Sequence, residues 1–251
     1  MTDSLGLSFG DIVLVGAICF VAGVVRGFSG FALSALVMAA ATWRLPPIEL
    51  IPMLWFLELG SSLMLARGSV RDADIRLAFI LVTGTWVGLP VGLSLTTTLP
   101  VETSRNVVLL LILGLAALQL ARIRIPAMAT QPGTVAAGFL AGIATGLGNI
   151  GGMVVALYVL ARGDAARAMR GTMVIILFAG SLGGFIYLQL FGVMTEQSAL
   201  RGALFVLPTL LGVWIGSRLF NPAMERFYKP VCLMLLIGLA SVGLIRMGVA
   251  A

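Results

Sequence analysis

The chain has 251 residues, of which 60% are hydrophobic and 10% are charged, and its mean hydropathy is +1.11. No soluble domain of this length needs so much apolar surface, so the composition indicates a membrane protein. The formal net charge of +6 does not indicate nucleic-acid binding, because the arginines lie mainly in short loops between apolar runs. Histidine is absent, which excludes imidazole bases and histidine-ligated metals, and we expect neither a metal site nor a cofactor.

Two long apolar segments are interrupted by glycine-rich stretches. The first, Ile12 to Ala41, is broken at residues 26–30 (RGFSG), and the second, Val135 to Ala161, is broken at residues 145–152 (TGLGNIGG). A broken helix leaves backbone N–H groups without partners inside a membrane, where no water can satisfy them. Paired breaks of this kind predict the midplane binding site of a transporter, in which an anion accepts hydrogen bonds from these groups.

Six uninterrupted apolar runs are each long enough to form a membrane-spanning helix. They cover about residues 47–66, 75–98 and 103–121 in the first half of the chain and 169–191, 199–220 and 227–245 in the second. Together with the two interrupted segments they predict an all-α, polytopic membrane protein. Each half, residues 1–125 and 126–251, then contains one broken segment and three spans, and the halves form one transmembrane domain.

The two halves resemble each other in sequence. Residues 22–27 match 141–146, and Gly60-Ser61 matches Gly180-Ser181. In the next spans, the residues that fall opposite one another are Gly84, Gly88 and Gly92 in the first half and Pro208, Gly212 and Gly216 in the second. The last spans, residues 105–122 and 229–246, agree best. Four matches in the same order predict an internal duplication.

The loop charges distinguish two ways of folding the broken segments. If each segment crosses the membrane, the lysines and arginines other than Arg26 divide into eight and seven, which is no bias. If each is a re-entrant hairpin, one side keeps only Arg44, Arg105, Arg201 and Arg246, and the other gathers eleven. The positive-inside rule favours hairpins, each with two half-helices of roughly 14 residues that meet near the midplane. Both termini then face the periplasm or exterior, and three crossings per half make the halves inverted repeats suited to alternating access.

The second half-helix of each hairpin starts at the glycine-rich tip, where its amino end presents free N–H groups and the positive end of the helix dipole. Two such ends that face each other would bind an oxyanion with little formal charge. The predicted substrate-binding residues are Arg26, Gly27, Ser29 and Gly30 at the first tip and Gly146, Gly148, Asn149 and Gly151 at the second. For glycines away from the tips, such as Gly84 and Gly138, we favour tight helix packing instead.

Arg26 and Glu58 are the ionisable residues placed deepest in the apolar segments, and a charge at that depth usually has a partner or a function. Two hypotheses stay open. Either Arg26 neutralises the anion directly and Glu58 carries a coupling proton, or the two residues form a structural ion pair. On the first hypothesis, Arg26→Ala weakens transport more than folding. Ser61 and Ser181 lie near the same level and either line the cavity or bond back to carbonyls of their own helices.

The glycine-rich breaks at residues 22–30 and 146–152, together with the duplicated four-segment halves, resemble the sulfite exporter TauE/SafE family, whose members are also called 4-toluene sulfonate uptake permeases. The resemblance covers nearly the whole chain. It implies a multi-pass secondary transporter of the bacterial cytoplasmic membrane, and not an enzyme. The substrate that it implies is sulfite or a small organosulfonate anion.

Other functions stay open at this point. A passive anion channel, or a transporter of another small oxyanion or of a carboxylate, would use the same tips. A subunit that needs a partner protein is a further alternative, and the glycine-rich surfaces would allow a homodimer without requiring one. H+ and Na+ are the candidate coupling ions. An intramembrane enzyme is disfavoured, because the sequence offers no histidine and no serine or cysteine nucleophile beside a base.

Overall fold

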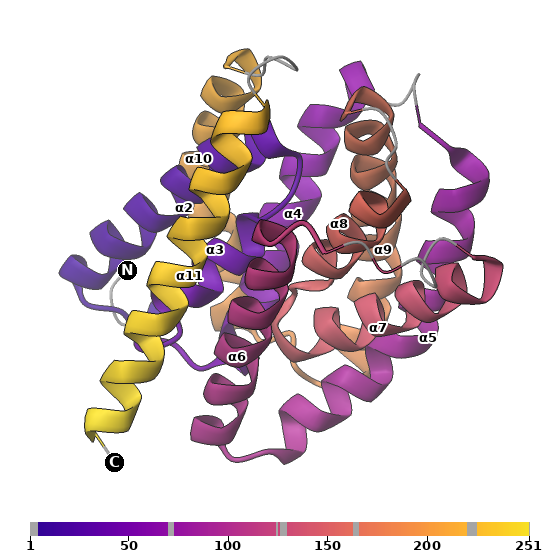
Figure 1. Ribbon diagram of the computed structural model, residues 1–251. Helices are drawn as coiled ribbons and strands as arrows, with labels where there is room; N and C mark the ends of the chain where they lie inside the picture. The colour runs from indigo at the N-terminus through magenta and orange to yellow at the C-terminus, as the bar shows by residue number, and fades with distance from the viewer. Residues whose placement is uncertain are drawn as a thin grey trace.

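The computed structural model describes residues 5–69, 73–123, 125, 130–162, 166–219 and 225–250, and within these residues the chain forms ten helices and no strands. The helices are α2 (Phe9–Ser29), α3 (Leu33–Ala41), α4 (Pro47–Ser69), α5 (Ile75–Thr98), α6 (Val101–Leu120), α7 (Gln131–Gly148), α8 (Gly151–Arg162), α9 (Ala166–Leu190), α10 (Glu196–Arg218) and α11 (Glu225–Ala250). Figure 1 shows them packed side by side. Six of them, α2, α4, α5, α6, α9 and α10, are long and apolar enough to cross a membrane, which confirms the predicted all-α, polytopic class.

The predicted spans correspond to α4, α5, α6, α9, α10 and α11, whose ends lie within a few residues of the predicted ends. The membrane-length helices differ from the predicted spans at two places. α2, which was predicted to be a half-helix, is long enough to cross a membrane. In α11, the apolar stretch in the described part of the chain, Pro230–Arg246, is shorter than the six membrane-length helices.

Both interrupted segments fold back on themselves as helical hairpins. In the first, the chain after α3 returns to the start of α2, where Arg44 Nε lies 2.6 Å from Asp11 Oδ1. In the second, the start of α7 and the end of α8 meet through a 2.9 Å hydrogen bond between the hydroxyl groups of Thr134 and Tyr158. Each segment therefore returns toward the point at which it began, so the predicted fold-back is confirmed.

The two arms of each hairpin are unequal. α2 has 21 residues and α3 has 9, while α7 has 18 and α8 has 12, so the prediction of similar half-helices was wrong. α2 starts early because Ser8 and Asp11 form a reciprocal capping box at its amino end. α3 is short because it lies between the tip, where Gly30 is left-handed with a φ of 80°, and the Pro46-Pro47 pair that precedes and opens α4.

The long arm of each hairpin packs lengthwise on a helix from the other half of the chain. α2 lies parallel to α10, and α7 lies parallel to α5 on the opposite flank of the molecule (Figure 1). The helices are so close that a Cβ atom added to Gly27 would collide with the carbonyl of Val213 in α10, and one added to Gly146 would collide with the carbonyl of Leu89 in α5. The sequence alignment pairs Gly27 with Gly146 and Val213 with Leu89. The same contact thus recurs at positions that the sequence alignment matches.

The hairpins enter the bundle from opposite ends. At one end, Arg201 near the start of α10 donates to the carbonyl of Leu5 over 2.8 Å and to Glu49 at the start of α4 over 2.5 Å. At the other end, the amide of Asp74 before α5 donates to Thr172 Oγ1 near the start of α9 over 3.0 Å. α2, α4 and α10 therefore begin at one end, and α5, α7 and α9 begin at the other. The two tips consequently point into the bundle from opposite directions.

Candidate substrate site

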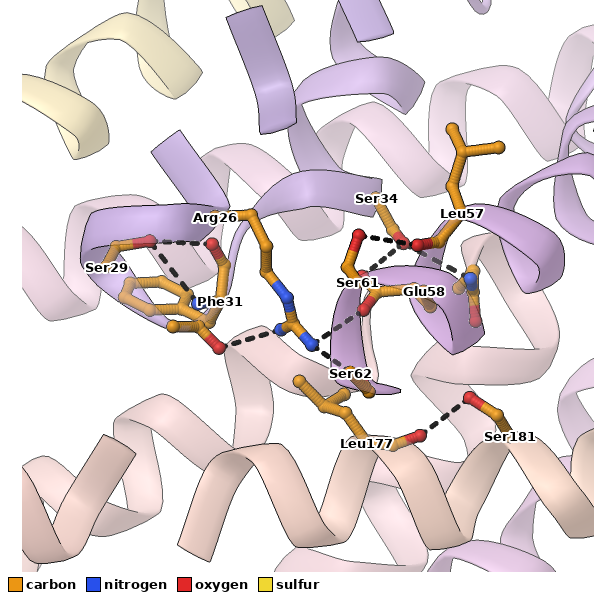
Figure 2. A network of polar contacts seen from close by, with 12 residues as sticks. Arg26, Ser29, Phe31, Ser34, Leu57, Glu58, Ser61, Ser62, Leu177 and Ser181 are labelled. Carbon is orange, nitrogen blue, oxygen red and sulfur yellow. Dashed lines mark hydrogen bonds and ion pairs between the residues drawn. The ribbon is translucent and has the colours of Figure 1, made fainter. Parts of the chain in front are cut away.

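A buried ion pair connects the first hairpin tip to α4. Arg26, in the last turn of α2, is completely buried, and its Nη2 lies 3.1 Å from Oε2 of Glu58, at the middle of α4. The same guanidinium donates to Ser62 Oγ over 2.9 Å and to the carbonyl of Gly30 over 2.7 Å. Figure 2 shows the Arg26 side chain reaching from the tip to Ser62 and Glu58. Of the two hypotheses drawn from the sequence, the structure contains the ion pair.

Glu58 also connects the first tip to the second. Its Oε1 accepts a 2.7 Å hydrogen bond from Ser34 Oγ in the first turn of α3. Ser34 Oγ in turn accepts a 3.2 Å hydrogen bond from Nδ2 of Asn149 at the second tip. A continuous chain of polar side chains, from Asn149 through Ser34 and Glu58 to Arg26, thus joins the two tips level with the middle of α4.

A cavity of about 50 Å³ lies beside the second tip. α4, α5, α7, α8 and α9 contribute its walls. The residues that line it are Ile51, Trp55, Glu58, Thr85, Leu89, Leu93, Ala141, Thr145, Gly146, Asn149, Gly151, Gly152, Val155, Ile176, Leu177, Gly180, Ser181, Gly184 and Leu188. One water molecule needs roughly 10–15 Å³ of such space, so the cavity has room for a small guest such as an anion of a few heavy atoms.

The hydrogen-bond donors that remain for a guest lie at the amino end of α8. In the part of the chain that the structure describes, the N–H groups of Gly151 and Gly152 donate to no backbone carbonyl, as expected for the first turn of a helix. The hydroxyl groups of Thr145 and Ser181, by contrast, donate to carbonyls of their own helices over 2.7 Å and 2.6 Å. The site can therefore hold an anion through backbone N–H groups, the Asn149 amide and the positive end of the α8 dipole.

A comparison with models of known protein families identifies the family of the chain. The model of the family described as sulfite exporter TauE/SafE matches residues 15–242. The chain belongs to this family. Searches among curated proteins and among solved structures found no match. Membership confirms the resemblance seen in the sequence, and together with the apolar helices it identifies a multi-pass membrane protein of a transporter family.

Five of the predicted site residues line the cavity of this TauE/SafE protein. They are Glu58, Gly146, Asn149, Gly151 and Ser181. All except Glu58 come from the second half of the chain, so the cavity belongs mainly to the second hairpin tip and to the helices that enclose it. The structure therefore brings the two tips into contact, and this cavity lies at the second of them.

The other predicted residues lie outside the lining of this cavity. They are Arg26, Gly27, Ser29, Gly30, Gly148 and Ser61. Ser29 Oγ closes the turn of the first tip by donating to a carbonyl two residues on, over 2.7 Å, and Ser61 donates to its own helix over 2.6 Å. A Cβ atom on Gly148 would lie 2.8 Å from the side chain of Val108 in α6, so this glycine serves helix packing. The role of these residues in binding stays a prediction.

Sequence reasoning missed several lining residues, of which the most important are Trp55, Gly152, Gly180 and Gly184. Trp55 forms a wall of the TauE/SafE cavity, and its Nε1 donates to the carbonyl of Ser181 over 2.7 Å. The available signal was the repeat of Gly60-Ser61 in Gly180-Ser181, which marks α9 as the counterpart of α4. That signal did not reveal that the two helices face each other across the cavity.

Proposed function

We propose that the protein is a secondary transporter that moves sulfite or a small organosulfonate anion across the bacterial cytoplasmic membrane by alternating access. The observation that carries the proposal is the cavity at the second tip, where the amino end of α8 opens into a space enclosed by α4, α5 and α9. Asn149, Gly151 and Gly152 bind the anion there. Membership in the TauE/SafE family supports the class of substrate.

The charge of the site suits reversible binding. The amino end of α8 supplies backbone donors and a partial positive charge. Glu58 lies on the cavity wall, but its carboxylate is 3.1 Å from the guanidinium of Arg26, which offsets the repulsion of an anion. Glu58 stays the predicted coupling residue because it borders the cavity, with H+ or Na+ as the coupling ion.

The opposed hairpins support alternating access. The cavity is lined by α4 from Ile51 to Glu58 and by α9 from Ile176 to Leu188, so it lies between the middle of the bundle and the end where α4 begins. The positive-inside rule assigns that end to the exterior, because it carries few of the loop arginines. The matched contacts of α2 on α10 and of α7 on α5 support two halves that exchange inward and outward roles.

Counterflow in proteoliposomes tests the proposal. Vesicles loaded with sulfite, methanesulfonate or ethanesulfonate should take up labelled sulfite or sulfonate, with saturation and trans-stimulation. Uptake that neither saturates nor responds to substrate on the opposite side would indicate a channel instead. Absence of uptake of all three anions under H+, Na+ and voltage gradients would overturn the proposal.

Asn149→Gly is expected to weaken anion binding by about 10-fold to 100-fold, because a hydrogen bond to a charged group contributes roughly 1.5–3 kcal/mol. Glycine removes the amide while it tolerates the left-handed backbone at this position, where φ is 55°. Titration of the purified protein with sulfite, alongside its thermal unfolding, checks the prediction. An unchanged affinity with unchanged unfolding would show that the amide does not contact the anion.

A further inference from the structure

Two groups of glycines in the described helices differ in what surrounds them, apart from those such as Gly148 and Gly183 whose Cβ atom would collide with a side chain. In the first group, a Cβ atom would collide with the backbone of a neighbouring helix, as at Gly88 against the carbonyl of Phe139 and at Gly212 against that of Phe20. These glycines are required by the close approach of two helices. In the second group, the added Cβ atom would meet only side chains at ordinary contact distances, or nothing at all.

Gly180, which is partly exposed, and Gly184, which is buried, belong to the second group in α9. A Cβ atom on Gly180 would approach nothing closer than the side chain of Thr85, at 4.0 Å. A Cβ atom on Gly184 would lie 3.8 Å from Trp55 and 3.9 Å from Leu89. Alanine would fit at both positions, and alanine is the better helix former. Packing therefore does not explain these glycines, whereas both line the cavity, where a missing methyl group leaves space.

Gly180 and Gly184 lie one after the other along the cavity, leading away from the anion-binding end of α8. A Cβ atom on Gly152, at the amino end of α8, would lie 3.3 Å from Leu177 of α9, so the anion-binding end of α8 is level with Leu177. Gly180 and Gly184 lie about 5 Å and about 10 Å further along the α9 axis, toward the end where α4 begins. Trp55 and Leu89 flank this stretch with apolar surface.

We infer that Gly180 and Gly184 form the floor of a subsite for the organic substituent of a sulfonate. The inference rests on the proposed function and extends it. The sulfonate oxygens bind at Gly151 and Gly152, and the carbon substituent lies along Gly180 and Gly184, between Trp55 and Leu89. Sulfite has no substituent and leaves the space beside Gly180 and Gly184 empty. The two glycines then determine how large a sulfonate the protein accepts.

Transport by Gly180→Ala and Gly184→Ala variants tests the subsite. The methyl group added at Gly180 should raise the KM for ethanesulfonate roughly 10-fold or more, the effect of one methylene group in a fitted apolar pocket. The methyl group added at Gly184, which lies further from the sulfonate, should do the same for a longer alkanesulfonate. The KM for sulfite should change less than about twofold in both variants. Thermal unfolding should stay unchanged or shift upward, because alanine replaces glycine in a helix without a clash. The matched control is Gly114→Ala in α6, where a Cβ atom would meet nothing within 4 Å and which does not line the cavity.

The possible outcomes separate the subsite from the proposed function. Equal changes for sulfite and ethanesulfonate, or no change for either, would overturn the subsite while transport itself stands. Wild-type transport of sulfite without any sulfonate would overturn the subsite in the same way. If the wild-type protein moves neither anion, the proposed function fails, and the subsite fails with it.

Discussion

Arg26→Ala is expected to destabilise the protein by about 3–5 kcal/mol, the usual effect of removing one partner from a buried ion pair. The variant leaves the Glu58 carboxylate, which is 6% exposed, without its cation, and it removes the donor to Ser62 and to the Gly30 carbonyl. This reverses the expectation from sequence, in which transport suffers more than folding. Thermal or denaturant-induced unfolding in detergent micelles measures the loss.

Two further variants show whether the loss comes from the unpaired charge. The double variant Arg26→Met, Glu58→Gln removes both charges and should recover most of the stability, because an apolar or neutral replacement of a buried pair is often close to neutral. Arg105→Ala breaks a pair with Glu102, which is 66% exposed in its side chain, and should change stability by less than about 1 kcal/mol. Wild-type stability of Arg26→Ala combined with lost transport would instead restore the hypothesis that Arg26 serves the anion.

Gly216→Ala and Gly92→Ala are each expected to destabilise the protein by about 3 kcal/mol, the upper part of the range for an overpacked interior. A Cβ atom at Gly216 would collide with the carbonyl of Val24, and one at Gly92 would collide with the carbonyl of Ile143. These are matched contacts of α10 with α2 and of α5 with α7. Because backbone cannot move aside as a side chain can, each helix pair must separate, which unfolding measurements in micelles would detect.

The comparison between the two variants is as informative as the size of either effect. If the contacts are equivalent, the two losses should agree within about 0.5 kcal/mol, the usual accuracy of adding independent effects. Gly238→Ala in α11, where a Cβ atom would meet nothing within 4 Å, should leave stability unchanged or raise it. A large loss in Gly216→Ala with none in Gly92→Ala would show that the two halves do not depend on matched packing.

Much of the architecture was predictable because a glycine-rich break or a long apolar run determines the structure at its own position in the chain. The breaks near Gly30 and Asn149 mark left-handed residues that end α2 and α7, and the distribution of loop arginines indicated that each segment folds back. The lengths of the arms could not be predicted from the same pattern. They depend on the capping box at Ser8, which extends α2, and on the packing of α2 along α10.

The site was less predictable than the fold because its asymmetry depends on one long side chain. Both tips carry glycines and a polar residue, so the sequence pattern predicts binding residues at both. In the structure, Arg26 is completely buried in its pair with Glu58 and does not line the cavity, while Thr145, its counterpart in the alignment, bonds to its own helix and borders the cavity. Gly180 and Gly184 could not be distinguished from packing glycines, because only the positions of their neighbours separate the two kinds.

The exchange of packing partners between the halves has a consequence for how the protein is made. α2 leaves the ribosome early, but the helix against which its glycine face packs, α10, begins only at Glu196. The first hairpin therefore lies in the membrane without α10, the helix on which it packs, until most of the polypeptide has been synthesised. Were the halves made as two separate polypeptides, each would need to find the other before its own hairpin could be held in place.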